Sequence, residues 1–307
     1  MITTHLLIKN DLSKIEATLE SLSAIDCEVL VGDLGSTDGT AAVCQDHGHK
    51  VFPTNLPRDA ARNKLAGLSK TDWQFYVEPG EVVSSGHDLF HSLEGKSKRA
   101  YIITDGMITK EIRLWKKGDC KFVNPVFESL QPDDSEPVNI FIVGVEQPNY
   151  LLDLLKWKEQ SPHLAEVDYY LACQYLALKD YPKFLTHANY YLFKDGNPNY
   201  PTIMTRYYLA QINLHVNRNV HEATRNLIYC LAHKPLMSEF WCALGDCYYR
   251  AGVPEKAVEF FRMAIELGKD RPTDDPYPIE LAKYDEYPNK MIDLCRSILK
   301  TTYPYRA

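Results

Sequence analysis

The stretch "CEVLVGDLGSTDGT", residues 27–40, decides how the first half of the chain folds. Its apolar start predicts a buried strand that ends at Asp33, and a polar, glycine-rich turn then leads into a helix. Gly35 lets the backbone approach a ligand closely, and Ser36 or Asp38 can cap the helix. Asp33 can accept hydrogen bonds from a base or a ribose. The same turn would also serve as a plain, well-capped connection between strand and helix, so the local chemistry leaves both interpretations open.

Short apolar runs alternate with helical patterns through the first half of the chain. We expect strands at 5–10, 27–33, 50–53 and 73–79, and helices at 11–23, 36–48 and 58–70. This alternation predicts a largely parallel sheet that is covered by helices on both faces. Ligands of such sheets bind beyond the carboxyl ends of the strands, where Asp33 and Glu78 are expected to lie. Further strands at 99–106, 110–118 and 138–146 predict an antiparallel extension that completes a domain of residues 1–147.

The second half of the chain, residues 148–307, loses the strand patterns and repeats a pattern of helix pairs. Within 238–271, fixed places are taken by Trp241, Leu244, Gly245 and Tyr248 on one helix, and by Ala257, Phe261 and Ala264 on the next. This pattern resembles a tetratricopeptide repeat, whose period is about 34 residues. Comparable pairs occur at 204–237 and 168–193, and 284–300 is expected to form a capping helix. Because no single repeat can bury its apolar face, stacking of repeats predicts an all-α domain.

Composition excludes several classes of protein. The 307 residues are 45% hydrophobic and 24% charged, which is typical of a globular protein with a sizeable core. A formal net charge of −7 gives no overall attraction to nucleic acid or anionic membranes. The eight cysteines include no Cys-x-x-Cys pair, which argues against a disulfide framework or a zinc site. No apolar run approaches the ~20 residues that cross a bilayer, and the first residues lack the pattern of a signal peptide. We expect a cytoplasmic protein without a membrane partner.

A second informative stretch is "DWQFYVEPGE", residues 72–81, in which a buried strand ends in two acids around a Pro-Gly turn. Together with "LLIKND" (6–11), "DLGSTDGT" (33–40) and "RDAARNKLAG" (58–67), it resembles the nucleotide-binding half of a family 2 glycosyltransferase of the GT-A fold. It is most similar to the bacterial and phage branch in which tetratricopeptide repeats follow the catalytic domain. The resemblance implies a GT-A-like α/β nucleotide-diphospho-sugar domain, a nucleotide-sugar donor that is most often a UDP-sugar, and an inverting reaction.

The resemblance also implies roles for individual residues. Asp33 would bind the nucleotide base, and Arg62 would lie near the phosphates or support the acidic motif. The other positions of the nucleotide-sugar site would be Lys9, Asn10, Gly35, Ser36, Asp38, Asn63, Glu78, Gly80 and Arg113. Glu81 and Glu128 are the candidate catalytic bases that would deprotonate the acceptor.

Three positions depart from the pattern of the family. The family's Asp-x-Asp metal motif is degenerate here, because Glu78 and Gly80 stand in place of the two aspartates, and Phe127 replaces a family histidine. Glycine has no side chain that could bind a cation, so Glu78 and Glu81 are the candidate ligands for Mg²⁺ or Mn²⁺. The departing diphosphate needs positive charge, which either a weakly held metal or fixed Lys and Arg side chains must supply. The missing ligand favours weak or absent metal dependence.

Three hypotheses for the function remain, and two of them differ only in the acceptor. Tetratricopeptide repeats hold extended peptides or mediate dimerisation, so a peptide or protein acceptor is the leading hypothesis and a homodimer is reasonable. Modified bases of phage DNA are an alternative acceptor, since positive charge can be segregated on one face of an acidic chain. Gly80 and Phe127 motivate a third hypothesis from another class, a degenerate transferase domain that serves as a binding scaffold.

Overall fold

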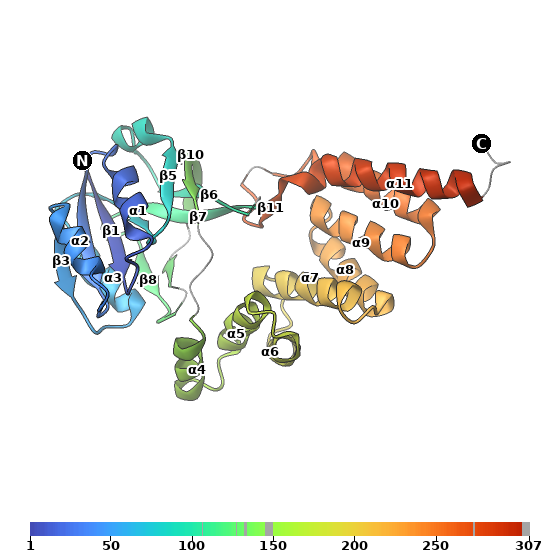
Figure 1. Ribbon diagram of the computed structural model, residues 1–307, viewed down its shortest axis with the longest axis horizontal. Helices are drawn as coiled ribbons and strands as arrows, with labels where there is room; N and C mark the ends of the chain where they lie inside the picture. Colours follow the sequence, from blue (N-terminus) through green and yellow to red (C-terminus); the bar gives the residue numbers. More distant parts are fainter. Residues whose placement is uncertain (106, 127, 132–133, 145–149, 273, 303–307) are drawn as a thin grey trace. The chain divides into compact units, whose positions relative to one another are not determined.

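The computed structural model describes residues 1–302 except 106, 127, 132–133, 145–149 and 273 (Figure 1). The chain divides into two compact units, Met1–Pro148 and Asn149–Ala307. The predicted domain boundary at 147 falls among residues outside this description. Within the described ranges, no helix combines the length and the apolar character that crossing a membrane requires.

The first unit is built on a mixed sheet (Figure 1). Its strands are β1 (Ile2–Ile8), β2 (Cys27–Asp33), β3 (Lys50–Pro53), β4 (Trp73–Val77), β5 (Val82–Ser85), β6 (Ser97–Thr104), β7 (Met107–Lys116) and β10 (Ser135–Val143). They follow the order β3-β2-β1-β4-β7-β6-β10-β5, while β8 (Lys121–Val123) pairs with β9 (Ser129–Gln131) separately. Strands β1 to β4 run parallel, whereas β7 is antiparallel to both β4 and β6. The parallel part therefore brings the carboxyl ends of β1, β2 and β4 to one edge of the sheet.

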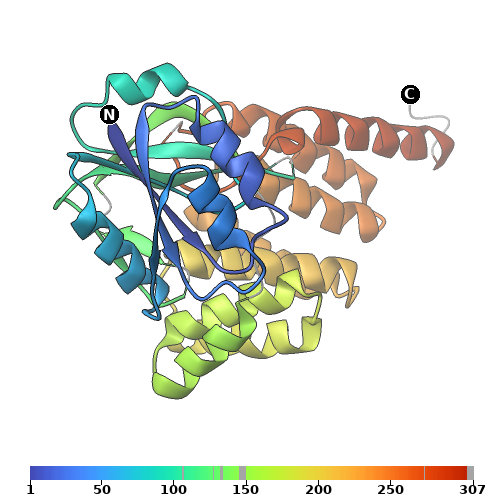
Figure 2. The ribbon, with the colours of Figure 1, turned by 60° about the vertical axis from the view of Figure 1, so that its left-hand side comes forward.

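Helices cover both faces of the parallel strands, because successive residues of β1 are buried on opposite faces of the sheet. Leu6 and Ile8 join a core that includes Leu19 of α1 (Ile15–Leu22) and extends under α2 (Thr40–Asp46). Leu7 points to the other face and packs against Leu65 of α3 (Arg58–Leu68). Successive residues of a strand face opposite sides of its sheet, so β1 alone supplies both cores. Helices α1 and α2 lie side by side on their face (Figure 2).

The second unit consists mainly of helices (Figures 1 and 2), which follow one another through short connections up to α10, whereas residues 269–285 separate α10 from α11. They are α4 (Leu151–Gln160), α5 (Ala165–Ala177), α6 (Tyr181–Lys194), α7 (Tyr200–His215), α8 (Val220–His233), α9 (Ser238–Arg250), α10 (Pro254–Gly268) and α11 (Glu286–Thr302). The pairs α5–α6, α7–α8 and α9–α10 are those that the sequence predicts, and α11 packs on α10 as the expected cap. A Cβ at Gly245 would lie 2.7 Å from Phe261 Cε1, so glycine is what lets α9 and α10 approach.

The predicted architecture is confirmed, because an α/β unit built on a mixed sheet is followed by a unit of paired helices. The short elements η1 (His87–His91), β11 (Ile279–Glu280) and η2 (Leu281–Tyr284) complete the two units. One pairing differs from the expected antiparallel extension, because β10 runs parallel to β6 and antiparallel to β5. β7 ends and β10 begins at the same end of the sheet, beside the start of β6, so β10 runs parallel to β6. Helix α2 also starts four residues later than predicted, since Gly39 adopts a left-handed φ of 95° before it.

Candidate functional site

Two loops meet at the carboxyl edge of the parallel strands, one after β1 and one after β2. Asn10, whose φ is 59°, accepts at its Oδ1 from the Thr37 N–H at 2.7 Å. Its own N–H donates to Ser36 Oγ at 3.2 Å. Asp38 Oδ2 accepts from the Leu12 N–H at 3.0 Å. These bonds join the two loops, so the shape of this edge is set before any ligand arrives.

Asp33 ends β2 and shapes the turn that follows. Its Oδ1 accepts from the N–H groups of Gly35 at 3.2 Å and Ser36 at 2.8 Å. Gly35 has a φ of 91°, a conformation that favours glycine. Asp38 Oδ1 accepts from the Thr40 N–H at 3.0 Å just before α2, although the N-cap residue of this helix is Gly39 and not Asp38. In the described part of the chain Asp33 Oδ2 has no hydrogen-bond partner, so this oxygen is available to a ligand.

The strand β4 ends in a tight turn that contains Glu78, Gly80 and Glu81. The Glu81 N–H donates to the Glu78 carbonyl oxygen at 3.0 Å, and Gly80 has a φ of 93°, as in a type II turn. The Gly80 N–H donates to Thr18 Oγ1 at 2.7 Å, which ties the turn to α1. An L side chain at position 80 would be strained. An acidic residue in place of Gly80 would therefore cost about 1–2 kcal/mol.

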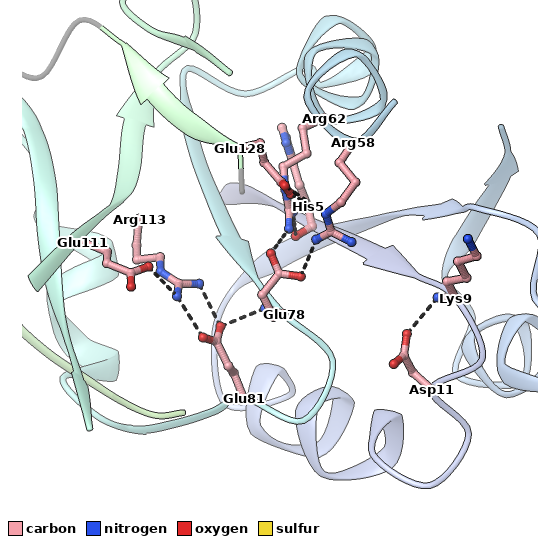
Figure 3. A network of polar contacts seen from close by, with 10 residues as sticks. All are labelled: His5, Lys9, Asp11, Arg58, Arg62, Glu78, Glu81, Glu111, Arg113 and Glu128. Atoms are coloured by element: carbon pink, nitrogen blue, oxygen red, sulfur yellow. Dashed lines mark hydrogen bonds and ion pairs between the residues drawn. The ribbon is translucent and has the colours of Figure 1, made fainter. Parts of the chain in front are cut away.

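Two arginines of α3 hold two of the acids at this edge (Figure 3). Glu78 accepts from Arg62 Nη2 at one carboxylate oxygen and from Arg58 Nη2, at 2.9 Å, at the other. Glu128 accepts from Arg58 Nε at 2.8 Å and from Arg62 Nε at 2.9 Å. Arg62 is fully buried, with its guanidinium carbon 4.6 Å from the centre of the Tyr76 ring. Burial works to raise the pKa of Glu128, but Arg62 and Arg58 outweigh it and hold that pKa below its usual range, so the carboxylate stays ionised.

Glu81 lies in a second, separate ion pair. Arg113 donates from Nη1 to Oε2 of Glu81 at 2.7 Å and from Nη2 to Oε1 at 2.8 Å. It also donates to Glu111 at 2.9 Å, and its guanidinium carbon lies 4.4 Å from the centre of the Tyr76 ring. Burial raises the pKa of Glu81 while Arg113 opposes the shift. Despite its own burial, the pKa of Arg113 is raised further by Glu81, so the guanidinium stays charged.

These contacts show the surroundings of several residues that were expected at the site. Both carboxylate oxygens of Glu81 and of Glu128 accept hydrogen bonds from arginines, whereas their expected roles as catalytic base or metal ligand stay predictions. Arg113 is buried against Glu81 instead of facing a nucleotide. The amide of Asn63 exchanges two hydrogen bonds of 2.9 Å with the backbone of Phe122, which joins α3 to β8. Of the two roles expected for Arg62, the structure shows support of the acidic residues.

Sequence reasoning missed Arg58 and Asp11. Arg58 begins α3 four residues before Arg62, a spacing that places both side chains on one face and was the available signal. Asp11 accepts from the Lys9 N–H at 2.7 Å, and within the described ranges it forms no ion pair. Burial is the main cause of its raised pKa, and the Glu78 charge adds to the shift. Phe127, which the family comparison singled out, lies outside the described residues.

The acids of the expected metal motif do not fit a divalent cation. The carboxylate oxygens of Glu78 and Glu81 already accept hydrogen bonds from arginines, and Gly80 offers no side chain. Hard cations need several oxygen ligands at once. Among the side chains that the structure describes, no group of three or more His, Cys, Asp or Glu residues is arranged to hold a metal ion.

Comparisons with known proteins give distant likenesses. No protein-family model and no curated protein matches the chain. The helical half resembles residues 41 to the end of MamA from Desulfovibrio magneticus RS-1, at 17% identity and a TM-score of 0.38 over 51% of this chain and 86% of that one. It also resembles the Sgt2 TPR domain from Aspergillus fumigatus, at 14% identity and a TM-score of 0.34 over 45% and 81% of the two chains. Residues 1–349 of TarS from S. aureus are similar along 96% of this chain and 91% of their own length, at 12% identity and a TM-score of 0.39. These low values assign no function to the chain.

Proposed function

We propose that the first unit binds a nucleotide-sugar at the carboxyl edge of β1, β2 and β4 and transfers its sugar to an acceptor. The resemblance of the sequence to family 2 glycosyltransferases of the GT-A fold suggests this activity. The observation that carries it is Asp33, which commits one carboxylate oxygen to its own turn and leaves the other without a partner in the described part. The neighbouring loop is already fixed by Asn10 and Ser36, so little ordering is needed on binding.

In this proposal Asp33 accepts from an N–H of the base or from a ribose hydroxyl. A uracil base presents such an N–H, which supports a UDP-sugar as donor. The exposed Lys9 side chain follows β1 and adds positive charge at the same edge. Transfer breaks the bond between the anomeric carbon and the diphosphate oxygen. The acceptor atom forms its new bond on the opposite face of the sugar, which inverts the anomeric centre.

The acceptor must also lose a proton during transfer. Glu81 and Glu128 are both held by arginines, whereas Asp11 lies at the same edge and forms no ion pair within the described ranges. Asp33 is assigned to the nucleotide and Asp38 accepts from the Leu12 and Thr40 N–H groups, so we assign this task to Asp11. Its raised pKa suits a group that takes up a proton during the reaction.

The acceptor remains a hypothesis from the sequence. A peptide or protein that the helical pairs of the second unit engage is the leading candidate, and modified DNA is the alternative. A second function, nucleotide-sugar binding without transfer, is favoured by one specific observation. Both acids that the sequence suggested as bases are committed to buried ion pairs.

The experiment is a calorimetric titration with UDP-glucose and UDP-N-acetylglucosamine, followed by analysis of released sugar. Asp33→Asn keeps an oxygen for the turn but replaces the ligand-facing oxygen by an amide donor, so the Kd should rise about tenfold or more. The matched control is Asp46→Asn, which changes an exposed acid at the end of α2. If neither UDP-sugar nor UDP bound the wild-type protein, the proposal would fail. Binding without any sugar release, across peptide and DNA acceptors, would favour the scaffold.

A further inference from the structure

We propose that arginine side chains, and Arg58 above all, take the place of the divalent cation at this site, so that the diphosphate of the donor binds without Mg²⁺ or Mn²⁺. This inference rests on the proposed function, because it concerns the leaving-group half of the same site. It assigns Arg58 a direct contact with the diphosphate. The neighbouring Arg62 has a different task, which is to keep Glu78 in place.

The carboxylate oxygen atoms at the turn already accept hydrogen bonds from arginines. Each carboxylate oxygen of Glu78 accepts from a different arginine, and those of Glu81 accept from Arg113. A cation at this turn would have to displace guanidinium groups from both acids. Gly80 cannot be exchanged for a ligand without strain, since its φ is 93°. The arrangement therefore competes with a metal ion instead of recruiting one.

The two arginines of α3 also balance the charge of the acids that they hold. Glu78 and Glu128 contribute two negative charges, and Arg58 and Arg62 contribute two positive ones (Figure 3). An acidic pair without arginines would attract a divalent cation and would repel a diphosphate in its absence. A neutral cluster does neither, because opposite charges a few ångströms apart cancel at longer range. The arginines thus neutralise these acids as a divalent cation would.

The two arginines differ in how deeply they are buried. The Arg62 side chain is fully buried, whereas 15% of the Arg58 side chain is exposed. Arg58 is also the first residue of α3, at the edge where Glu78 begins the turn. A phosphate group can displace Glu78 from Arg58, because guanidinium forks bind phosphate well. Glu78 keeps its bond to Arg62 in that case, so no buried charge is left without a partner.

The experiment begins with the wild-type protein, so it does not depend on a variant that folds. The Kd of UDP is measured by titration in excess EDTA and again in excess MnCl₂, with GDP and ADP in parallel. We expect the two Kd values for UDP to agree within about threefold. Mn²⁺ added alone should keep the paramagnetic resonance signal of the free ion. Binding that requires Mn²⁺ would overturn this inference and leave the proposed function standing, whereas no nucleotide binding in either condition would overturn both.

Variants then test Arg58 itself. Arg58→Met should raise the Kd of UDP in EDTA about tenfold or more, which is about 1.4 kcal/mol per factor of ten. Mn²⁺ should recover part of this loss, because the substitution releases one oxygen of Glu78. Arg58→Lys should lie between the two, since it keeps the charge but not the fork. Lys64→Met removes an exposed cation of the same helix and should bind UDP like the wild type. Wild-type affinity of Arg58→Met in EDTA, with circular dichroism showing a folded protein, would contradict the assignment.

Discussion

The substitution Arg62→Met is expected to remove about 3 kcal/mol from the free energy of unfolding of the first unit. Methionine keeps an unbranched side chain of comparable length, so the cavity that it leaves is small. What the substitution removes is the guanidinium, which bonds Glu78 and Glu128 and stacks on Tyr76. The change in the free energy of unfolding therefore reports the contribution of one buried charged group.

The magnitude follows from the burial of the partners. Arg62 is fully buried and 5% of the Glu128 side chain is exposed. Removing one partner of a buried ion pair typically costs about 3–5 kcal/mol, because the other charge stays in a poor solvent. Arg58 continues to bond both acids in the variant, which places the expected loss at the lower end of that range.

The assay is native-state hydrogen exchange read by mass spectrometry on peptides from β1 and β4. A loss of 3 kcal/mol corresponds to a fall of about 150-fold in the protection of the slowest amides. Lys64→Met is the matched control, since it introduces the same residue on the exposed side of α3. A fall below about fivefold, or an equal fall in the control, would show that the buried guanidinium does not stabilise the unit in this way.

Three more predictions concern other parts of the chain. His5 is buried and hydrogen-bonded to Gln74, and its pKa is lowered to about 3, mainly by burial. Below about pH 6.5 the imidazole is therefore protonated in the unfolded chain but stays neutral in the folded one. The free energy of unfolding should fall as pH drops through that window, by about 2 kcal/mol at pH 5. When it is measured by urea titration at several pH values, it should depend less on pH in His5→Gln than in the wild type. Gly80→Ala should cost about 1–2 kcal/mol in thermal unfolding because of its positive φ, whereas Gly67→Ala, inside α3 with open space around the new Cβ, should stabilise by about 0.5–1 kcal/mol. Gly245→Ala should cost about 1–3 kcal/mol by overpacking against Phe261, which is measured as faster amide exchange in α9 and α10, and unchanged exchange there would count against the packing argument.

The parts of the fold that are encoded locally could be predicted from the sequence. The succession of strands and helices up to β4 and the helix-pair period around Gly245 each depend on residues close together in the chain, and both were identified correctly. The turn that begins at Asp33 belongs to the same category, since its bonds to Gly35 and Ser36 span three residues or fewer. The pairing of β10 could not be predicted in this way, because it depends on the path of a long connection.

The ion pairs of the site are different in kind. Glu128 stands 70 residues from Arg58, and Glu81 stands 32 residues from Arg113. Nothing in the sequence near an acid says that a distant guanidinium will cover it. For this reason the acids at the sheet edge could be located, while their commitment to arginines could not.

The positive φ of Gly80 has a consequence for descent. A lineage that carries this turn acquires an acid at position 80 only at a cost in stability, and Glu78 is still covered by two arginines after that replacement. Each intermediate step along such a route would either distort the turn or strand a charge. We therefore expect relatives of this chain to keep Gly80 and both arginines, Arg58 and Arg62, together or to lose all three.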